Sequence, residues 1–283
     1  MQNVGKPLMK PEDFRLFKEF VAAMFGLLLE DGKRGILAAK LLPRLEELGL
    51  STFAEYYSYL KFASGSIDEH LKFISLITNN ETYFFREESQ LRAFADEVLP
   101  ALKVKKLKNG DRKIRIVSAG CSSGEEVYSL AMLILESGSF AWNWDVKITG
   151  VDIDPKVIEK AEAGIYSGRA FQSTPGHYQE RYFKECRCGH QVRKVVRNIT
   201  DFVQGNLLNL EKVLADSSVD IIFCRNVLIY FNDETVRRVV ENFARFLVDD
   251  GLLFLGHSES LSRITDHYLP LRFPGAIVYR VRG

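Results

Sequence analysis

Hydrophobic residues recur at helical spacing through the first 80 residues of the chain, and no strand pattern appears before residue 110. Phe14, Phe17, Val21 and Phe25 lie on one side of a predicted helix that Pro11 opens, since proline is tolerated in a first helical turn. Further helices are predicted over 33–48, which ends at the candidate cap Gly49, from 51 onward, and over 67–78. We therefore expect an N-terminal helical domain over residues 1–80.

Short β-branched runs then alternate with helical stretches, which is typical of βαβ units in a parallel sheet. The predicted strands are 114–119, 146–151, 200–203, 219–224 and 252–255, and the predicted helices between them are 125–136, 155–163 and 234–247. Two extended segments, 268–273 and 276–281, predict an antiparallel hairpin at the end of the sheet. A charged, glycine-interrupted stretch predicts a small antiparallel β insertion at about 178–200. Residues 81–283 should thus form one α/β domain.

Composition narrows the class of protein. The 283 residues suggest about two domains at roughly 150 residues each. A hydrophobic content of 46% excludes a disordered chain, and 38 Lys+Arg against 37 Asp+Glu argues against a dedicated nucleic-acid binder. No apolar run approaches the ~20 residues of a membrane span. Four cysteines without a signal-peptide pattern indicate a reduced, cytoplasmic protein with no membrane insertion.

The turn after the first predicted strand is the first candidate site. Gly120 and Gly124 let the backbone turn tightly, but the spacing is neither that of a dinucleotide-binding fold nor that of a P-loop. A nicotinamide oxidoreductase is therefore disfavoured. Acidic residues follow the turn, which favours a ligand with hydroxyl groups and a cation over one with a pyrophosphate. Asp152, just past the second strand, is placed to bind ribose hydroxyls, while Asp154 before Pro155 has the position of a helix N-cap.

Three further clusters carry candidate chemistry. One is the polar and aromatic run at 79–87, another is Arg225-Asn226 directly after a buried strand, and the third is the sequence GHSES at 256–260. Ligands of open α/β sheets bind at the carboxyl ends of strands, where the second and third clusters lie. The sequence Cys186-Arg-Cys188-Gly-His190 lacks a fourth ligand and the usual zinc spacing, so we predict no metal site.

Taken together, these segments resemble the chemotaxis receptor methyltransferase family (CheR), in order and over almost the whole chain. The matching runs are NETYFFRE at 80–87, AGCSSGEEVYSLA at 119–131, DIDPKVIEKAEAGIY at 152–166, RYF at 181–183, GNLL at 205–208, IIFCRNVLIYF at 221–231 and GLLFLGHSESL at 251–261. The resemblance implies a class I S-adenosylmethionine-dependent methyltransferase fold, Rossmann-like, with an N-terminal all-helical domain. It also implies methyl transfer from S-adenosylmethionine to glutamate side chains of chemoreceptors, with S-adenosylhomocysteine as the product.

The same resemblance implies roles for individual residues. Arg86 and Tyr230 match the residues that the family places beside the transferred methyl group. The residues that match cofactor-contacting positions are Asn80, Thr82, Arg86, Gly120, Glu126, Asp152, Asn206, Leu207, Arg225 and Asn226. A glutamate side chain has a pKa of about 4.3 and is already ionised, so the reaction needs no general base, and His257 needs no catalytic role.

The implied partner is the cytoplasmic domain of a methyl-accepting chemoreceptor. Its contacts would be the basic helix 33–48, with Lys33, Arg34, Lys40 and Arg44, and the β insertion. We expect a monomer that binds no nucleic acid. Two alternatives stay open. One is a methyltransferase of the same fold with another protein or a small molecule as acceptor. The other is a non-enzymatic module that senses S-adenosylmethionine.

Overall fold

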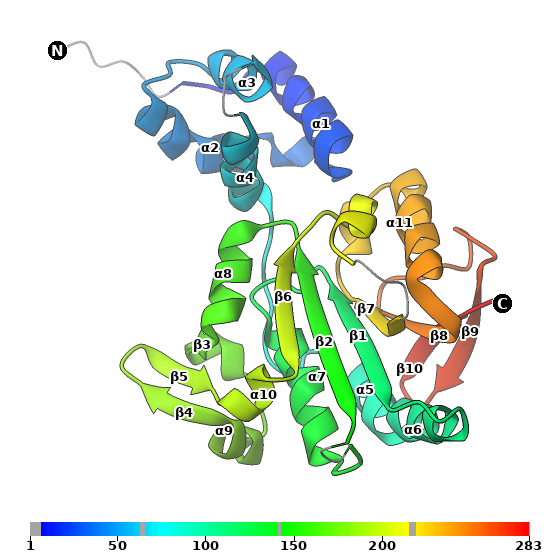
Figure 1. Ribbon diagram of the computed structural model, residues 1–283. Coiled ribbons are helices and arrows are strands. Elements are labelled where there is room, and N and C mark those ends of the chain that lie inside the picture. Colours follow the sequence, from blue (N-terminus) through cyan, green and yellow to red (C-terminus); the bar gives the residue numbers. More distant parts are fainter. Residues whose placement is uncertain (1–6, 63–65, 141–142, 215–218, 283) are drawn as a thin grey trace. The chain divides into compact units, whose positions relative to one another are not determined.

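The computed structural model of the protein describes residues 7–62, 66–140, 143–214 and 219–282. The chain forms two compact units (Figure 1). The first contains Met1–Asn79 together with Tyr230–Asn232, and the second contains Asn80–Ile229 and Asp233–Gly283. Residues 1–6 of the predicted helical domain lie outside the described residues.

The first unit is helical, as the hydrophobic spacing predicts. Its elements are α1 (Pro11–Phe25), the short 3-10 helix η1 (Asp31–Lys33), α2 (Arg34–Leu48), α3 (Phe53–Phe62) and α4 (Ser66–Ile77). Pro11 opens α1, and Gly49 ends α2 in the left-handed conformation with φ 66°, so both predicted helix signals are confirmed. The rings of Phe17, Tyr56 and Phe73 are fully buried and pack against one another. The aromatic contacts join α1, α3 and α4 into one core.

A buried ion pair ties three helices of the first unit together. The guanidinium of Arg44 on α2 donates to both oxygens of Glu69 on α4, at 2.9 and 2.5 Å. The hydroxyl of Tyr56 on α3 donates to the same carboxylate at 2.9 Å. Burial alone would raise the pKa of Glu69, but the hydrogen bonds from Arg44 and Tyr56 lower it overall. Glu69 is therefore an ionised side chain that is almost fully buried.

Three residues from far along the chain complete this unit. The N–H of Leu28 donates to the carbonyl of Tyr230 at 2.7 Å, and Leu27 pairs with Phe231 in an isolated antiparallel bridge. A bridge this short leaves no alternation of polar and apolar residues in the sequence. The sequence showed no strand pattern before residue 110 and therefore did not predict the bridge.

The second unit is built on a seven-stranded sheet in the order β6-β2-β1-β7-β8-β10-β9 (Figure 1). The first five strands of that order are parallel, and β10 and β9 are antiparallel to their neighbours. This confirms the predicted parallel sheet with an antiparallel C-terminal hairpin. The strands are β1 (Lys113–Ala119), β2 (Asp145–Asp152), β6 (Thr200–Gln204), β7 (Val219–Cys224), β8 (Leu247–Leu255), β9 (Tyr268–Phe273) and β10 (Ala276–Val281).

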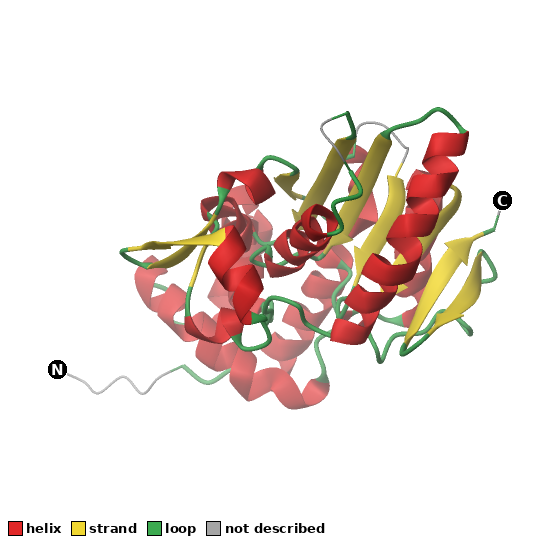
Figure 2. Ribbon diagram, turned by 90° about the horizontal axis from the view of Figure 1, so that it is seen from below, coloured by secondary structure: helices red, strands yellow, loops and turns green. Residues whose placement is uncertain are grey.

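Helices cover both faces of this sheet (Figure 2). The connections from β1 to β2 and from β7 to β8 run in opposite directions across the sheet, so right-handed crossovers place their helices on opposite faces. The helical elements are α5 (Glu88–Arg92), the π-helical η2 (Ala93–Val98), α6 (Leu99–Lys108), α7 (Glu125–Glu136), α8 (Pro155–Ala163), η3 (Gly168–Phe171), α9 (Gly176–Tyr182), α10 (Lys194–Arg197), η4 (Leu207–Lys212), η5 (Leu228–Tyr230) and α11 (Asp233–Phe246). Sequence patterns assigned no element to residues 88–108, although Leu91, Phe94 and Val98 recur there at helical spacing and are buried.

A second, three-stranded antiparallel sheet lies beside the main one in the order β3-β5-β4. It consists of β3 (Ile165–Tyr166), β4 (Phe183–Cys186) and β5 (Gly189–Val192). The hairpin of β4 and β5 falls within the stretch where the sequence predicted a β insertion. Among the described helices, none combines the length and the apolar character that crossing a bilayer requires.

The Glu69 ion pair gives a prediction for stability. Replacing Glu69 by Gln removes the buried carboxylate of the pair and leaves Arg44 with only the exposed Glu47 as a counter-charge, and removing one partner of a buried pair costs up to about 3–5 kcal/mol. Tyr56→Phe removes one hydrogen bond and should cost only about 1–2 kcal/mol. Urea unfolding followed by circular dichroism measures both losses. Equal stability of Glu69→Gln and the wild type would contradict this account of the core.

Candidate active site

The turn after β1 places backbone N–H groups at the carboxyl edge of the sheet. Gly120 and Gly124 adopt left-handed conformations with φ 78° and 90°, and Ser122 does so with φ 48°. The N–H groups of Gly120 and Cys121 both donate to the carbonyl of Val151 at the end of β2, at 2.7 and 3.0 Å. A Cβ atom on Gly120 would lie 2.4 Å from Cγ2 of Val227, so only glycine fits there.

Asp152 ends β2 directly beside this turn. One carboxylate oxygen accepts the N–H of Ser122 at 2.8 Å, and the other accepts the N–H of Asp154 at 3.0 Å. Burial raises the pKa of Asp152 to about 6. Asp154 accepts the N–H of Lys156 at 3.0 Å, which confirms the predicted N-cap of α8. The two neighbouring acids therefore have different roles: Asp154 caps α8, and Asp152 holds the turn after β1.

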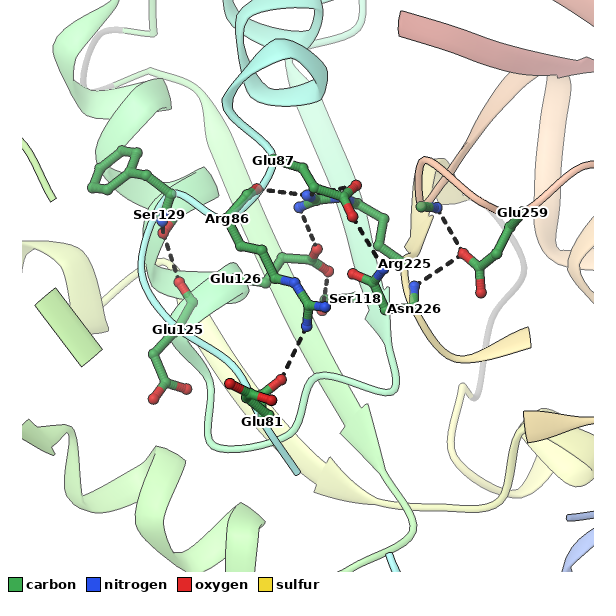
Figure 3. Close-up of polar contacts among 12 residues, drawn as sticks. Glu81, Arg86, Glu87, Ser118, Glu125, Glu126, Ser129, Arg225, Asn226 and Glu259 are labelled. Atoms are coloured by element: carbon green, nitrogen blue, oxygen red, sulfur yellow. Dashed lines mark hydrogen bonds and ion pairs between the residues drawn. The ribbon is translucent and has the colours of Figure 1, made fainter. Parts of the chain in front are cut away.

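A buried arginine joins three segments that are far apart in the sequence (Figure 3). The Nη1 of Arg225 donates to Glu126 Oε2 at 2.8 Å, and its Nη2 contacts Glu87 Oε2 at 3.2 Å and the carbonyl of Arg86 at 2.5 Å. The second oxygen of Glu126 accepts the hydroxyl of Ser118 on β1 at 2.8 Å. The side chain of Arg225 is only 3% exposed. Arg225 thus links the carboxylates that border the site.

The backbone is strained in both of the segments, 85–87 and 225–226, that meet at Arg225. Phe85, Glu87 and Asn226 have φ between 55° and 59°, a conformation that non-glycine residues seldom adopt. The Asn226 side chain donates to Glu87 Oε1 at 3.0 Å, so two of the three strained residues hold each other. Burial alone would raise the pKa of Glu87, but Arg225 and Asn226 lower it overall. Strained residues that side chains lock in place are typical of functional sites.

The segment that begins the second unit runs along the same edge. The side-chain amide of Asn80 donates to Asp154 at 2.7 Å, and the carbonyl of Asn80 accepts the Ser122 hydroxyl at 3.0 Å. Arg86 is half-buried, donates to the carbonyl of Glu81 at 3.0 Å and lies over the ring of Tyr83, 5.8 Å from its centroid. Thr82, between them, is half-buried.

The remaining predicted residues fall in two places. Asn206 caps η4 by accepting the N–H of Leu208 at 2.9 Å, and Leu207 beside it is 6% exposed. They follow Gly205, whose N–H donates to the carbonyl of Asp152 at 2.8 Å. Tyr230 belongs to the first unit, where its hydroxyl lies 3.5 Å from the amide nitrogen of Asn79.

The second unit thus brings together Asn80, Gly120, Glu126, Asp152, Arg225 and Asn226 at one edge of its sheet, with Asn206 and Leu207 next to them. Sequence reasoning did not single out Ser118, Glu87 or Glu259 as site residues. Glu87 and Glu259 stood inside the quoted runs, but a single sequence does not show which side chains pair over more than 100 residues. Cys121 is fully buried, which raises the pKa of its thiol and disfavours a thiolate nucleophile.

The donor chemistry of this edge fits S-adenosylmethionine. Its ribose carries two hydroxyl groups, which a carboxylate such as Asp152 binds well. Its sulfonium and amino groups are cationic, and carboxylates of Glu126 and Glu87 lie at the edge. Gly120 leaves the backbone open to close approach by a ligand. No Lys occurs from Gly120 to Glu126, where a nucleotide phosphate would favour one.

Comparisons with known proteins agree with this chemistry. The family model described as CheR methyltransferase, SAM binding domain, matches residues 80–274, and the model described as CheR methyltransferase, all-alpha domain, matches residues 12–78. Chemotaxis protein methyltransferase 2 of Vibrio cholerae is 40% identical over 92% of this chain and 90% of its own length. Chemotaxis protein methyltransferase of Escherichia coli is 35% identical over 93% and 90%. A probable biofilm formation methyltransferase of Pseudomonas aeruginosa is 32% identical over 93% of this chain and 61% of its own length.

The pKa of Asp152 gives a prediction for ligand binding. A raised pKa means that the carboxyl is protonated below about pH 6 and ionised above it, and only the ionised form accepts hydrogen bonds from both ribose hydroxyls. Affinity for S-adenosylhomocysteine should therefore fall up to roughly tenfold per pH unit below pH 6. Calorimetric titration from pH 5 to 8 measures it.

Two variants sharpen that titration. Asp152→Asn should bind about 10–100-fold more weakly at pH 7 and lose this pH dependence, because an amide offers one acceptor oxygen. Asp201→Asn removes an exposed carboxylate on β6 and should titrate like the wild type. Identical pH curves for Asp152→Asn and Asp201→Asn would remove Asp152 from the binding site.

Proposed function

The chain belongs to the CheR methyltransferase family and uses S-adenosylmethionine as its cofactor, and from this we propose that it forms γ-methyl esters on glutamate side chains of a chemoreceptor. The observation that supports this proposal most directly is the set of hydrogen bonds around Arg225. They fix the segments of residues 86–87, 118–126 and 225–226 at one edge of the sheet. These are the segments whose sequences resemble the family's cofactor site. We assign cofactor contacts to Asn80, Thr82, Arg86, Gly120, Glu126, Asp152, Asn206, Leu207, Arg225 and Asn226.

The reaction asks for alignment more than for acid–base chemistry. When bound, S-adenosylmethionine supplies an electrophilic methyl group on a cationic sulfur. The acceptor glutamate is ionised at neutral pH, with a pKa of about 4.3, so no residue of this chain has to remove a proton. Holding two reactants in line can contribute about 7–11 kcal/mol to catalysis. The fixed, strained loops around Arg225 support such a role, because they hold the site in one shape.

We propose that Arg86 orients the carboxylate of the acceptor glutamate or that of the cofactor. A guanidinium has five N–H donors in a planar fork that matches a carboxylate, and one of them is used by the Glu81 carbonyl. A half-buried position over Tyr83 leaves this group in contact with solvent. Tyr230 is proposed to position the methyl group that is transferred, through its hydroxyl or the face of its ring.

Fewer basic side chains of α2 are available to a receptor than its sequence suggests. Lys40 donates to the carbonyl of Thr78 at 3.2 Å, and Arg44 is held by Glu69 and Glu47. These two charges therefore stabilise the first unit. Lys33 and Arg34, at the start of α2, are exposed. We propose that this end of the helix meets acidic side chains of the receptor, and that the exposed β4–β5 hairpin with Lys184 and Arg187 adds a second contact.

The chemical group that receives the methyl distinguishes glutamate methylation from methylation of another acceptor and from a sensor that transfers no methyl group. Incubation with tritium-labelled S-adenosylmethionine and receptor fragment should label the receptor, and mild alkali should release the label as methanol, because carboxyl esters hydrolyse where N-methyl groups do not. An alkali-stable label would show another acceptor group. Binding of S-adenosylhomocysteine without any transfer would favour a sensor module.

Arg86→Ala should lower kcat/KM for this labelling by about 100-fold or more, because the carboxylate loses its orienting partner. Arg86→Lys should recover little of the loss, since an ammonium does not reproduce the fork. The control is Arg92→Ala, which removes an exposed arginine that pairs with Glu88 on α5. Equal rates for Arg86→Ala and Arg92→Ala would refute the assigned role.

Arg34→Glu should raise KM for the receptor fragment several-fold and make methylation less sensitive to salt, because the lost contact is electrostatic. Affinity for S-adenosylhomocysteine should stay the same. Lys212→Glu makes the same change of charge on an exposed residue of η4 and should leave KM unchanged. If both variants shift KM equally, net charge and not the start of α2 guides the receptor.

A further inference from the structure

One half-buried carboxylate, that of Glu259, holds the loop that follows β7. The Oε1 of Glu259 accepts three successive backbone N–H groups of the loop. Its Oε2 accepts two more, one from the first residue of the same loop and one from the residue that follows β8. The donors are Val227, Leu228 and Ile229 at 3.0, 2.8 and 3.3 Å, and Asn226 and Gly256 at 2.9 and 2.7 Å. Four consecutive residues therefore point their N–H groups at a single side chain, as Figure 3 shows for Asn226.

Such convergence forces the loop into one conformation. Asn226 is left-handed with φ 59°, which turns the chain sharply at the end of β7. The next three N–H groups open the short helix η5 (Leu228–Tyr230) and have no partners within a helix so short. Glu259 satisfies them all, so it acts as the anion that this backbone nest needs.

Gly256 is part of the same device. Its Cβ, if it had one, would lie 2.8 Å from Glu259 Oε2 and 2.9 Å from the N–H nitrogen of Asn226. The N–H of Glu259 donates back to the carbonyl of Gly256 at 3.0 Å, which closes a tight turn. The run Gly-His-Ser-Glu at the end of β8 thus forms a clamp, here called the Glu259 clamp, that consists of Gly256 and Glu259.

The clamped loop carries residues of the proposed site. Asn226 donates its side chain to Glu87, and Arg225 before it reaches Glu126. Tyr230 follows Ile229, the last residue that the clamp holds. We propose that Glu259 is a positioning residue for methyl transfer, which fixes the loop 226–229 and thereby sets Asn226 and the start of the Tyr230 segment. This inference rests on the proposed function.

Glu259→Gln tests the clamp with almost no change of shape. An amide keeps one acceptor oxygen but turns an NH2 group toward N–H donors, so at least two of the five hydrogen bonds are lost. We expect amide hydrogen exchange at residues 226–229 to accelerate at least tenfold, with no change at Ile221–Phe223 in β7. We expect kcat to fall at least tenfold. Glu241→Gln, an exposed change on α11, is the control for loss of charge.

A second variant keeps the carboxylate and disturbs it by contact alone. Gly256→Ala places a methyl group against Glu259 and Asn226 and should give the same pattern of exchange and kcat. Its control is Gly176→Ala, where no atom lies within 4 Å of the added Cβ. If Glu259→Gln does not fold, Gly256→Ala carries the test.

A double-mutant cycle separates positioning from mere stabilisation. Tyr230→Phe and Glu259→Gln should combine to less than the product of their separate effects on kcat, because both act through one loop. Wild-type kcat and exchange in the Glu259→Gln and Gly256→Ala proteins would overturn the inference, as would fully multiplicative effects in the cycle. A wild-type enzyme that methylates no receptor would defeat the proposed function instead, and the exchange data would still report on the clamp.

Discussion

The charge of Arg225 is the constraint on which the second unit depends. A guanidinium that is almost wholly buried is costly unless carboxylates surround it, and removing one partner of such a pair destabilises a protein strongly. Its partners, Glu87 and Glu126, come from the segment before β1 and from the first turn of α7. Segments that are more than 95 residues apart must therefore meet before any of these charges is satisfied. The same contacts that complete the fold bring the candidate site together.

This constraint also explains the character of the site. Hydrogen bonds from Arg225 and from backbone N–H groups hold the carboxylates of the site in fixed directions. None of these carboxylates is therefore free to move and act as a base. Glu259 repeats the principle without a cation, because five backbone N–H groups surround it. Methyl transfer to an ionised acceptor needs a rigid frame, and hydrogen bonds between these charged groups and the surrounding backbone supply one.

Local patterns predicted what depends on neighbours in the sequence. The helices of the first unit, the parallel sheet, the left-handed end of α2 at Gly49 and the N-cap at Asp154 all follow from spacing and propensity. Contacts between side chains that are far apart in the sequence did not follow from these local patterns. The sequence shows four basic residues at 33–48, but only the folded chain shows that Arg44 is bound by Glu69 and that Lys40 donates to the end of α4. Glu87, Ser118 and Glu259 were missed for the same reason, since their partners lie on distant strands and loops.

The bridge between Leu27 and Phe231 has a consequence for how this protein can be divided. Residues 230–232 belong to the helical unit, although the chain before and after them belongs to the sheet unit. The polypeptide therefore passes between the units three times, and the helical unit is not a contiguous cassette. A gene fragment that encodes only the first 79 residues would lack the strand partner of Leu27. A transplanted helical unit keeps this bridge only if both stretches of sequence are moved together.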